Sequence, residues 1–242
     1  MQIPIPTPIH DFSFNISLLR GFIYQTEAAI SENIGKYEKD GPDTFVIEEH
    51  PEDNIYITLN HYMGIDDQSF DLDKTFKIRY PSIMRRSAFL TIFGLLEHEM
   101  ENFCNIYSKE KKTNVKLSDL KGSGFERIDL FLKKIVGLTS STNYPELKKI
   151  IKLRNSCAHN DARFVTNDNQ PIKEIDDLIK KYPALLEKDE EQVLFKGDVL
   201  LTFLKVFEEY IKEIEAVITP LVKLRVSFNS GDKVATAVGI TP

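Results

Sequence analysis

Four stretches of this 242-residue chain carry apolar side chains at every third or fourth position, which is the spacing of one face of an α-helix. The stretches cover residues 82–108, 125–137, 144–158 and 199–218. Pro145 stands in the expected first turn of the third helix, and Asp198 directly precedes the fourth, as is typical of helix starts. A helix with one apolar face must bury that face against another element. The sequence therefore predicts a mainly α fold built on a four-helix bundle.

The first 80 residues have a different pattern, and Pro81 marks the boundary that we expect between them and the bundle. Residues 1–10 contain three prolines, which favour an extended chain, whereas residues 13–37 have helical spacing. Three short segments alternate like strands between Asp, Asn and Gly turns: residues 44–47, 55–59 and 75–79. We therefore expect an N-terminal helix plus a small β-containing extension over residues 1–80, for which the sequence indicates no function.

The helical bundle spans residues 81–220 in this prediction, and a polar excursion over residues 160–197 separates its third and fourth helices. A short helix is expected within that excursion, at residues 172–182. Pro220 is expected to end the last helix, and the Gly/Ser/Thr-rich residues 221–242 are expected to form a loosely ordered tail.

Composition excludes several classes of protein. The chain is 42% hydrophobic and 28% charged, which excludes a disordered chain. Its densest apolar runs, residues 88–96 and 199–207, are far shorter than the ~20 residues that span a bilayer. The first residues lack the basic and apolar segments of a signal peptide. Cys104 and Cys157 can form neither a disulfide framework nor a Cys-rich zinc site, so we expect a cytoplasmic protein without a membrane partner.

Charge is distributed unevenly along the chain. The net charge of −6 argues against a generic binder of polyanions. Residues 105–163, however, hold 13 Lys/Arg and 6 Asp/Glu, a balance of +7, whereas the remainder carries −13. A basic segment on an acidic body is consistent with a specific anionic partner such as RNA. The wet faces of ordinary amphipathic helices give the same pattern, so charge alone leaves both interpretations open.

The third helical stretch ends with Arg154-Asn155-Ser156-Cys157-Ala158-His159. Arg154 falls within the apolar arc of its helix, so it must be paired or line a cavity, because burying an unpaired charge is very costly. On an ideal helix His159 points about 140° away from Arg154. Both side chains can face one cleft only if the last turn unwinds or if two subunits share the cleft.

Arginine and histidine together suit cleavage of a phosphodiester. A guanidinium presents a rigid fork of donors to phosphate oxygens and stays charged at any working pH. An imidazole can take or give a proton near neutral pH. Because RNA carries its own nucleophile, the 2′-OH, such chemistry needs no metal or cofactor.

This string resembles the R-x4–6-H signature of HEPN domains, including the polar residue directly after the arginine. The order of a long helix, a second helix, the motif at the end of the third helix, a polar insertion and a long final helix is also similar to that fold, over about residues 82–220. The resemblance implies a metal-independent endoribonuclease of the kind found in toxin–antitoxin and phage-defence systems. It further implies a homodimer with facing motif helices, RNA as substrate and an antitoxin protein as a candidate partner.

By the same resemblance, Arg154 stabilises the transition state, His159 acts as general acid/base, and Asn155 orients or binds the RNA backbone. Members of the family often add an acidic residue from the first bundle helix, which holds the arginine. Glu97 is the residue of this chain that best fits that role on helix geometry. In one subgroup a tyrosine follows two residues after the histidine and is modified by a partner antitoxin; here that position is Asp161. The first candidates for phosphate contacts are Lys148, Lys149 and Lys152.

Structural explanations stand beside these roles. Arg154 and Glu97 can form an ion pair that only holds the bundle together, in a non-catalytic HEPN-fold module that binds RNA, a nucleotide or a protein partner. His159 can simply occupy the end of a helix, where the helix dipole favours it. Cys157 is expected to pack, and His98 to be solvated. The segment around His98 lacks the four-residue spacing of a helical metal pair, so we expect no metal site.

Overall fold

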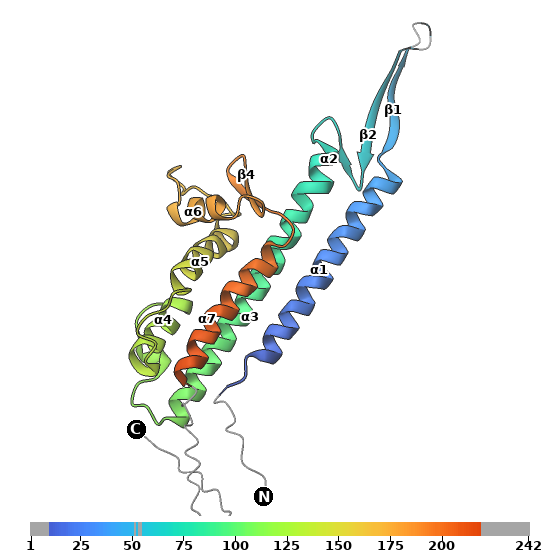
Figure 1. The fold of residues 1–242 in the computed structure, drawn as a ribbon. Helices are drawn as coiled ribbons and strands as arrows, with labels where there is room; N and C mark the ends of the chain where they lie inside the picture. The colour runs from blue at the N-terminus through green and yellow to red at the C-terminus, as the bar shows by residue number, and fades with distance from the viewer. Residues whose placement is uncertain (1–9, 51, 53–54, 219–242) are drawn as a thin grey trace, which may run out of the picture.

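The computed structural model describes residues 10–218, apart from residues 51, 53 and 54. Within this part the chain is mainly α with small antiparallel sheets, as the sequence predicts. Long helices lie side by side in Figure 1, and a two-stranded hairpin projects beyond one end of them. The predictions of an extended start before His10, of a helix end at Pro220 and of a loose tail over residues 221–242 lie outside the described residues.

The longer helices are α1 (Ser13–Asp40), α3 (Tyr80–Glu110), α5 (Tyr144–His159) and α7 (Val199–Ile218). The shorter ones are α2 (Leu72–Lys74), the π-helical turn η2 (Thr75–Arg79), the 3₁₀ turn η3 (Leu117–Asp119), α4 (Gly124–Phe131), the π-helical turn η4 (Leu132–Val136) and α6 (Lys173–Lys181). Strands β1 (Asp43–His50), β2 (Ile55–Tyr62) and β3 (Ile65–Asp66) form one sheet in that order, and β4 (Leu186–Asp189) pairs with β5 (Gln192–Phe195).

The four helices predicted for the bundle are present. Helices α3, α5 and α7 begin and end within two residues of their predicted bounds. The remaining helix is α4 continued by η4, and it ends at Gly137, whose φ of 95° is a left-handed value that glycine adopts without strain. The apolar residues expected to face inward on α7 are all buried: Val199, Leu200, Phe203, Leu204, Phe207, Ile211, Ile214 and Ile218.

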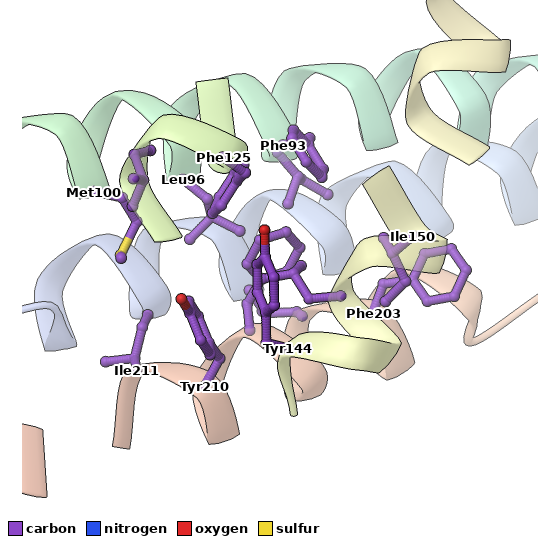
Figure 2. Packing of buried hydrophobic residues seen from close by; sticks show 14 of the residues in the cluster. Phe93, Leu96, Met100, Phe125, Tyr144, Ile150, Phe203, Tyr210 and Ile211 are labelled. Atoms are coloured by element: carbon purple, nitrogen blue, oxygen red, sulfur yellow. The ribbon is translucent and has the colours of Figure 1, made fainter. Parts of the chain in front are cut away.

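Aromatic rings fill the middle of the core. Phe93 of α3 packs edge-on against Phe125 of α4, with 5.0 Å between ring centres, and against Phe207 of α7 at 5.4 Å. Figure 2 shows side chains from α3, α4, α5 and α7 directed into this one layer, among them Phe93, Phe125 and Tyr210. Each such aromatic pair adds about 0.5–1.5 kcal/mol to the burial of its surface. The Phe93–Phe125 pair therefore fixes the start of α4 against the middle of α3.

Much of the predicted N-terminal extension is also present. Helix α1 confirms the helix expected at residues 13–37, and its Leu19 and Ile23 are buried in the same core as α3 and α7. Strands β1 and β2 confirm the first two predicted strands and pair with each other in antiparallel fashion. They form the projecting hairpin of Figure 1.

The predicted strand over residues 75–79 is wrong. These residues form the π-helical turn η2, so the backbone is helical without a break from the start of α2 to the end of α3. The widened turn lies directly before Pro81, whose missing N–H and bulky ring disturb the regular i→i−4 bonding of an α-helix. Phe76, which helped to suggest a strand, instead stacks on Tyr37 of α1 with 5.0 Å between ring centres.

The excursion between α5 and α7 is less polar than its sequence suggests. Helix α6 confirms the short helix predicted there, whereas the β4–β5 hairpin was not predicted. Val193 and Phe195 of β5 are buried, and the ring of Phe195 lies 5.5 Å from that of Phe89 on α3. The hairpin thus packs on α3, and Figure 1 shows α6 beside α5, with β4 next to α6.

Candidate active site

Arg154 lies on α5 at its contact with α3. Its side chain is 27% exposed, and its Nη2 lies 3.3 Å from Oε2 of Glu97 on α3. The guanidinium carbon lies 5.1 Å from the centre of the Phe93 ring, and Nη1 donates to Oδ1 of Asn155 at 3.1 Å. Its Nε is buried without a hydrogen-bond partner among the described residues. The expected pairing of Arg154 with Glu97 is therefore confirmed, and the guanidinium is half-buried with donors to spare.

The start of α4 holds Glu97 from the other side. The main-chain N–H of Phe125 donates to the Glu97 carboxylate. Gly124 has a φ of 51°, and a Cβ at this position would lie only 2.0 Å from Oε1 of Glu97, so glycine leaves the room that the carboxylate occupies. Burial raises the pKa of Glu97 above its usual 4.5; the charge of Arg154 opposes this rise, and Glu101 reinforces it.

His159 is the last residue of α5 and is exposed. The helix stays regular through this residue, because the N–H of Asn160 still bonds to the carbonyl oxygen of Ser156 at 2.8 Å. The last turn of α5 is therefore not unwound. Of the two ways to bring His159 beside Arg154, this excludes the one within a single chain. On one helix the two side chains leave the axis about 140° apart. Asn155 is exposed beside Arg154.

The chain turns sharply after His159. Asp161 and Ala162 have φ values of 47° and 59°, a left-handed conformation that costs a non-glycine residue about 1–2 kcal/mol. Arg86 of α3 holds the turn, since its Nη1 donates to the main-chain oxygen of Asp161 at 2.9 Å and to Oδ1 at 3.0 Å. Gln192 of β5 also donates to the Asp161 carboxylate. Both α3 and the β4–β5 hairpin therefore fix the segment that follows His159.

The three lysines predicted to contact phosphate have different surroundings. Lys148 and Lys152 are exposed, whereas Nζ of Lys149 lies 3.7 Å from the Asp177 carboxylate of α6. Lys152 and Asn155 together line a cavity of about 280 Å³ between α5 and the segment that leads into α6. Lys152 is thus the one of the three lysines that shares a cavity with a residue of the motif.

Comparison with known proteins assigns no function to this site. No family model, curated protein or solved structure matches the chain. Among the described residues, no group of three or more His, Cys, Asp or Glu side chains is placed to hold a metal ion. None of the helices in that part of the chain is long and apolar enough to cross a membrane.

Cys157 stands between Arg154 and His159 in the sequence, and it packs against the core as predicted. Burial raises the pKa of Cys157 to about 12, although the charge of Arg86 acts in the opposite direction. A thiol with such a pKa stays protonated near neutral pH and is a poor nucleophile. His98 is exposed on α3, also as predicted.

Three parts of the site were not predicted from the sequence: Phe93, Gly124 and Arg86. Phe93 is hidden in an ordinary apolar stripe, and the Gly-Ser-Gly turn before α4 gave no sign that it would touch Glu97. The result is a guanidinium fixed by a carboxylate and an aromatic ring, with an exposed imidazole at the end of the same helix. The first can bind and neutralise an anion, and the second can exchange a proton with a ligand.

Proposed function

We propose that this protein is a HEPN-type endoribonuclease that acts as a homodimer and cleaves RNA without a metal. Residues 81–220 would form the HEPN four-helix bundle, with Arg154, Asn155 and His159 as its motif. The resemblance of this motif to those of toxin–antitoxin and phage-defence nucleases supports a role in growth arrest or defence, with an antitoxin as a candidate partner.

The observation that supports this proposal best is the regular helix through His159. A straight helix directs Arg154 and His159 to different sides, so one chain does not aim both at one phosphate. A second copy with its α5 facing the first supplies the missing group, because the arginine of one subunit then meets the histidine of the other. Because Arg154 is partly exposed and His159 is exposed, both are accessible to such a cleft.

The reaction follows from the residues. His159 removes the proton from a ribose 2′-OH, whose oxygen attacks the adjacent phosphorus while the bond to the 5′ oxygen breaks. A second imidazole, or the same one after proton exchange, protonates that 5′ oxygen. Arg154 neutralises the charge that develops on the phosphoryl oxygens, and Glu97 and Phe93 keep its guanidinium in place. The products are a 2′,3′-cyclic phosphate and a 5′-hydroxyl.

Mixing two inactive variants tests both the activity and the shared cleft. Arg154→Lys is expected to reduce cleavage of RNA in EDTA about 100-fold and His159→Ala to abolish it, whereas His98→Ala, which removes an exposed histidine outside the motif, is expected to keep it. After exchange of subunits, the mixed dimer retains one Arg154 and one His159 on opposite chains. We expect the mixture to regain cleavage.

Three results would contradict the proposal. Cleavage that persists in both single variants would show that the motif is not catalytic. Active wild-type protein whose inactive variants do not complement each other would refute the shared cleft. Absence of cleavage in the wild type would refute the ribonuclease itself. Melting temperatures of all variants show whether any loss of activity comes from unfolding.

One observation also supports the second candidate, a non-catalytic module that binds RNA, a nucleotide or a protein. Arg154 is already paired with Glu97 and packed on Phe93 within a single chain, as a purely structural arginine would be. Such a module would bind without cleaving, and Arg154→Lys would lower its melting temperature without any change in a catalytic rate.

A further inference from the structure

A second group of arginines lies next to the motif. A cavity of about 360 Å³ opens between the start of α3, the turn after α5 and the β4–β5 hairpin. Arg79 and Arg86 line it from the helical segment, and Arg163 lines it from the turn. Asp161, two residues after His159, also lines it. Because consecutive Cα atoms are ~3.8 Å apart, this cavity begins within about 8 Å of the end of the motif.

Each of these arginines is paired with a carboxylate that is far more exposed than the arginine itself. The side chains of Arg86, Arg163 and Arg79 are 12%, 26% and 33% exposed, whereas those of their partners are 70%, 57% and 75% exposed. The partners are Asp161, Glu191 and Glu190, in that order. Exposed ion pairs contribute little to stability, so Glu190 and Glu191 can turn into solvent at little cost, whereas the Asp161 carboxylate also has to leave its hydrogen bond from Gln192.

The guanidinium groups would stay in place if those carboxylates left. Arg86 also donates to the main-chain oxygen of Asp161 at 2.9 Å. Arg163 donates to Oδ1 of Asn169 at 3.3 Å, and Arg79 donates to the mostly buried Asp189 at 3.3 Å. Arg163 and Arg79 thus have a second anchor on another residue, and Arg86 has one on the main chain of Asp161, which stays in place when the carboxylate turns away.

Two of the arginines also have donors to spare. Nε of Arg86 and Nε of Arg163 are buried and have no hydrogen-bond partner within the described part of the chain. A buried donor without a partner destabilises the folded state. A ligand that supplies acceptors relieves that destabilisation, and a phosphate group accepts from the edge of a guanidinium through two oxygens at once.

We infer that this arginine cavity binds a phosphate group, which displaces the exposed carboxylates of Asp161, Glu190 and Glu191. With these acids in place the three arginines are neutralised, so the ligand has to be an anion that binds more firmly than a surface carboxylate. The volume suits one nucleotide-sized group. The phosphate belongs either to an RNA strand that continues from the motif or to a free nucleotide. The first case rests on the proposed function.

Binding to a single-stranded 2′-O-methyl RNA, which lacks the nucleophilic 2′-OH, tests the cavity apart from cleavage. Fluorescence anisotropy with the full-length protein would compare Arg86→Gln and Arg163→Gln with Arg20→Gln. Arg20 on α1 is paired with Glu208 of α7, outside this cavity. Arg20→Gln therefore removes the same positive charge as the two cavity variants without changing the cavity. We expect each cavity variant to weaken binding at least tenfold and Arg20→Gln to change it less than twofold. Equal binding by all three variants would overturn the inference.

Asp161→Asn keeps the test decisive if an arginine variant unfolds. Asparagine tolerates the left-handed φ of this position, and it removes the charge that competes with phosphate. We expect binding to tighten about three- to tenfold, a gain that structural damage does not produce. Unchanged or weaker binding by a folded Asp161→Asn protein would count against the cavity.

The source of the phosphate is assigned by competition. If a nucleoside 5′-monophosphate raises the melting temperature of the wild type but not of Arg86→Gln, the ligand is a free nucleotide. If only the oligonucleotide binds, the ligand is an RNA strand; if neither binds, the inference is wrong. Cleavage is measured separately with unmodified RNA. Cleavage whose KM is unchanged in the cavity variants refutes an RNA strand as the source of the phosphate, whereas binding without any cleavage refutes the proposed nuclease alone.

Discussion

The contact between Gly124 and Glu97 gives the sharpest test of how Arg154 is held. In Gly124→Ala the new Cβ would lie 2.0 Å from Oε1 and 3.2 Å from Cδ of Glu97, where ordinary contacts begin at 3.4 Å. The carboxylate oxygen must therefore retreat by about 1.4 Å. Its hydrogen bond from the N–H of Phe125 cannot survive such a shift, and its 3.3 Å pairing with Arg154 changes with it.

Gly122→Ala is the matched control. Gly122 has a φ of 99°, so alanine is strained there as it is at Gly124, where φ is 51°. A Cβ on Gly122 would nevertheless meet only Cβ of Glu126 at 3.5 Å and backbone beyond it, which leaves Glu97 untouched. Each substitution is expected to cost about 1–2 kcal/mol from the backbone alone. For a chain of this size that lowers the melting temperature by ~2–8 °C.

The two variants should differ in activity. A displacement of about 1 Å in a positioning group can reduce a rate by ~100-fold, so we expect a loss of that order in Gly124→Ala and little loss in Gly122→Ala. Cleavage of a fluorophore–quencher RNA in EDTA measures this, at a temperature where both variants are folded. Hydrogen exchange of the Phe125 amide should speed up in Gly124→Ala alone. Equal cleavage rates in the two variants would refute a role for Glu97 in positioning Arg154.

Three further predictions follow from the surroundings of Glu97, Arg154 and the cysteines. The raised folded pKa of Glu97 means that the wild type loses stability as pH rises from the usual 4.5 through that pKa, so Glu97→Gln, which does not titrate, should lack this fall in melting temperature between pH 4.5 and 7. Arg154→Lys keeps a charge near Glu97 but loses the planar fork over Phe93, so kcat should drop about 100-fold while the melting temperature falls by only a few degrees. Burial raises the pKa of Cys104 and of Cys157 to about 12, so iodoacetamide at pH 8 should label neither thiol, as judged by mass spectrometry, until the protein is denatured.

Residues on regular helices were the ones whose positions could be predicted. The direction of the Glu97 side chain on an ideal helix predicts its pairing with Arg154. Because α3 is a regular helix at this residue, Glu97 has that direction and the ion pair is present. The same regularity explains why the residues of α7 that were expected to face inward are all buried, although Tyr210, which is buried as well, was not among them. Periodicity fixes the direction of a side chain only as long as the helix is regular.

Prediction failed where two segments distant in the sequence meet. Residues 75–79 alone do not distinguish a strand from a π-helical turn, because Pro81 follows them and Phe76 stacks on Tyr37 of another helix. The closeness of Gly124 to Glu97 likewise depends on how Phe125 docks against Phe93. The turn at Asp161 depends on Arg86, which is distant in the sequence.

The pKa of Glu97 bears on the choice between the catalytic and the structural interpretation of Arg154. A carboxylate retained only to stabilise the bundle would be expected to gain more from Arg154 than it loses by burial, and its pKa would then lie below the usual value. The opposite holds here, since burial, reinforced by the charge of Glu101, outweighs the attraction of Arg154 and the N–H of Phe125. Ionising Glu97 therefore costs more in the folded chain than in the unfolded chain, in spite of Arg154 beside it. A cost of this kind is typical of functional sites, where a charge is held in place for a ligand. This favours a guanidinium that Glu97 aims at a phosphate over one that merely ties α3 to α5.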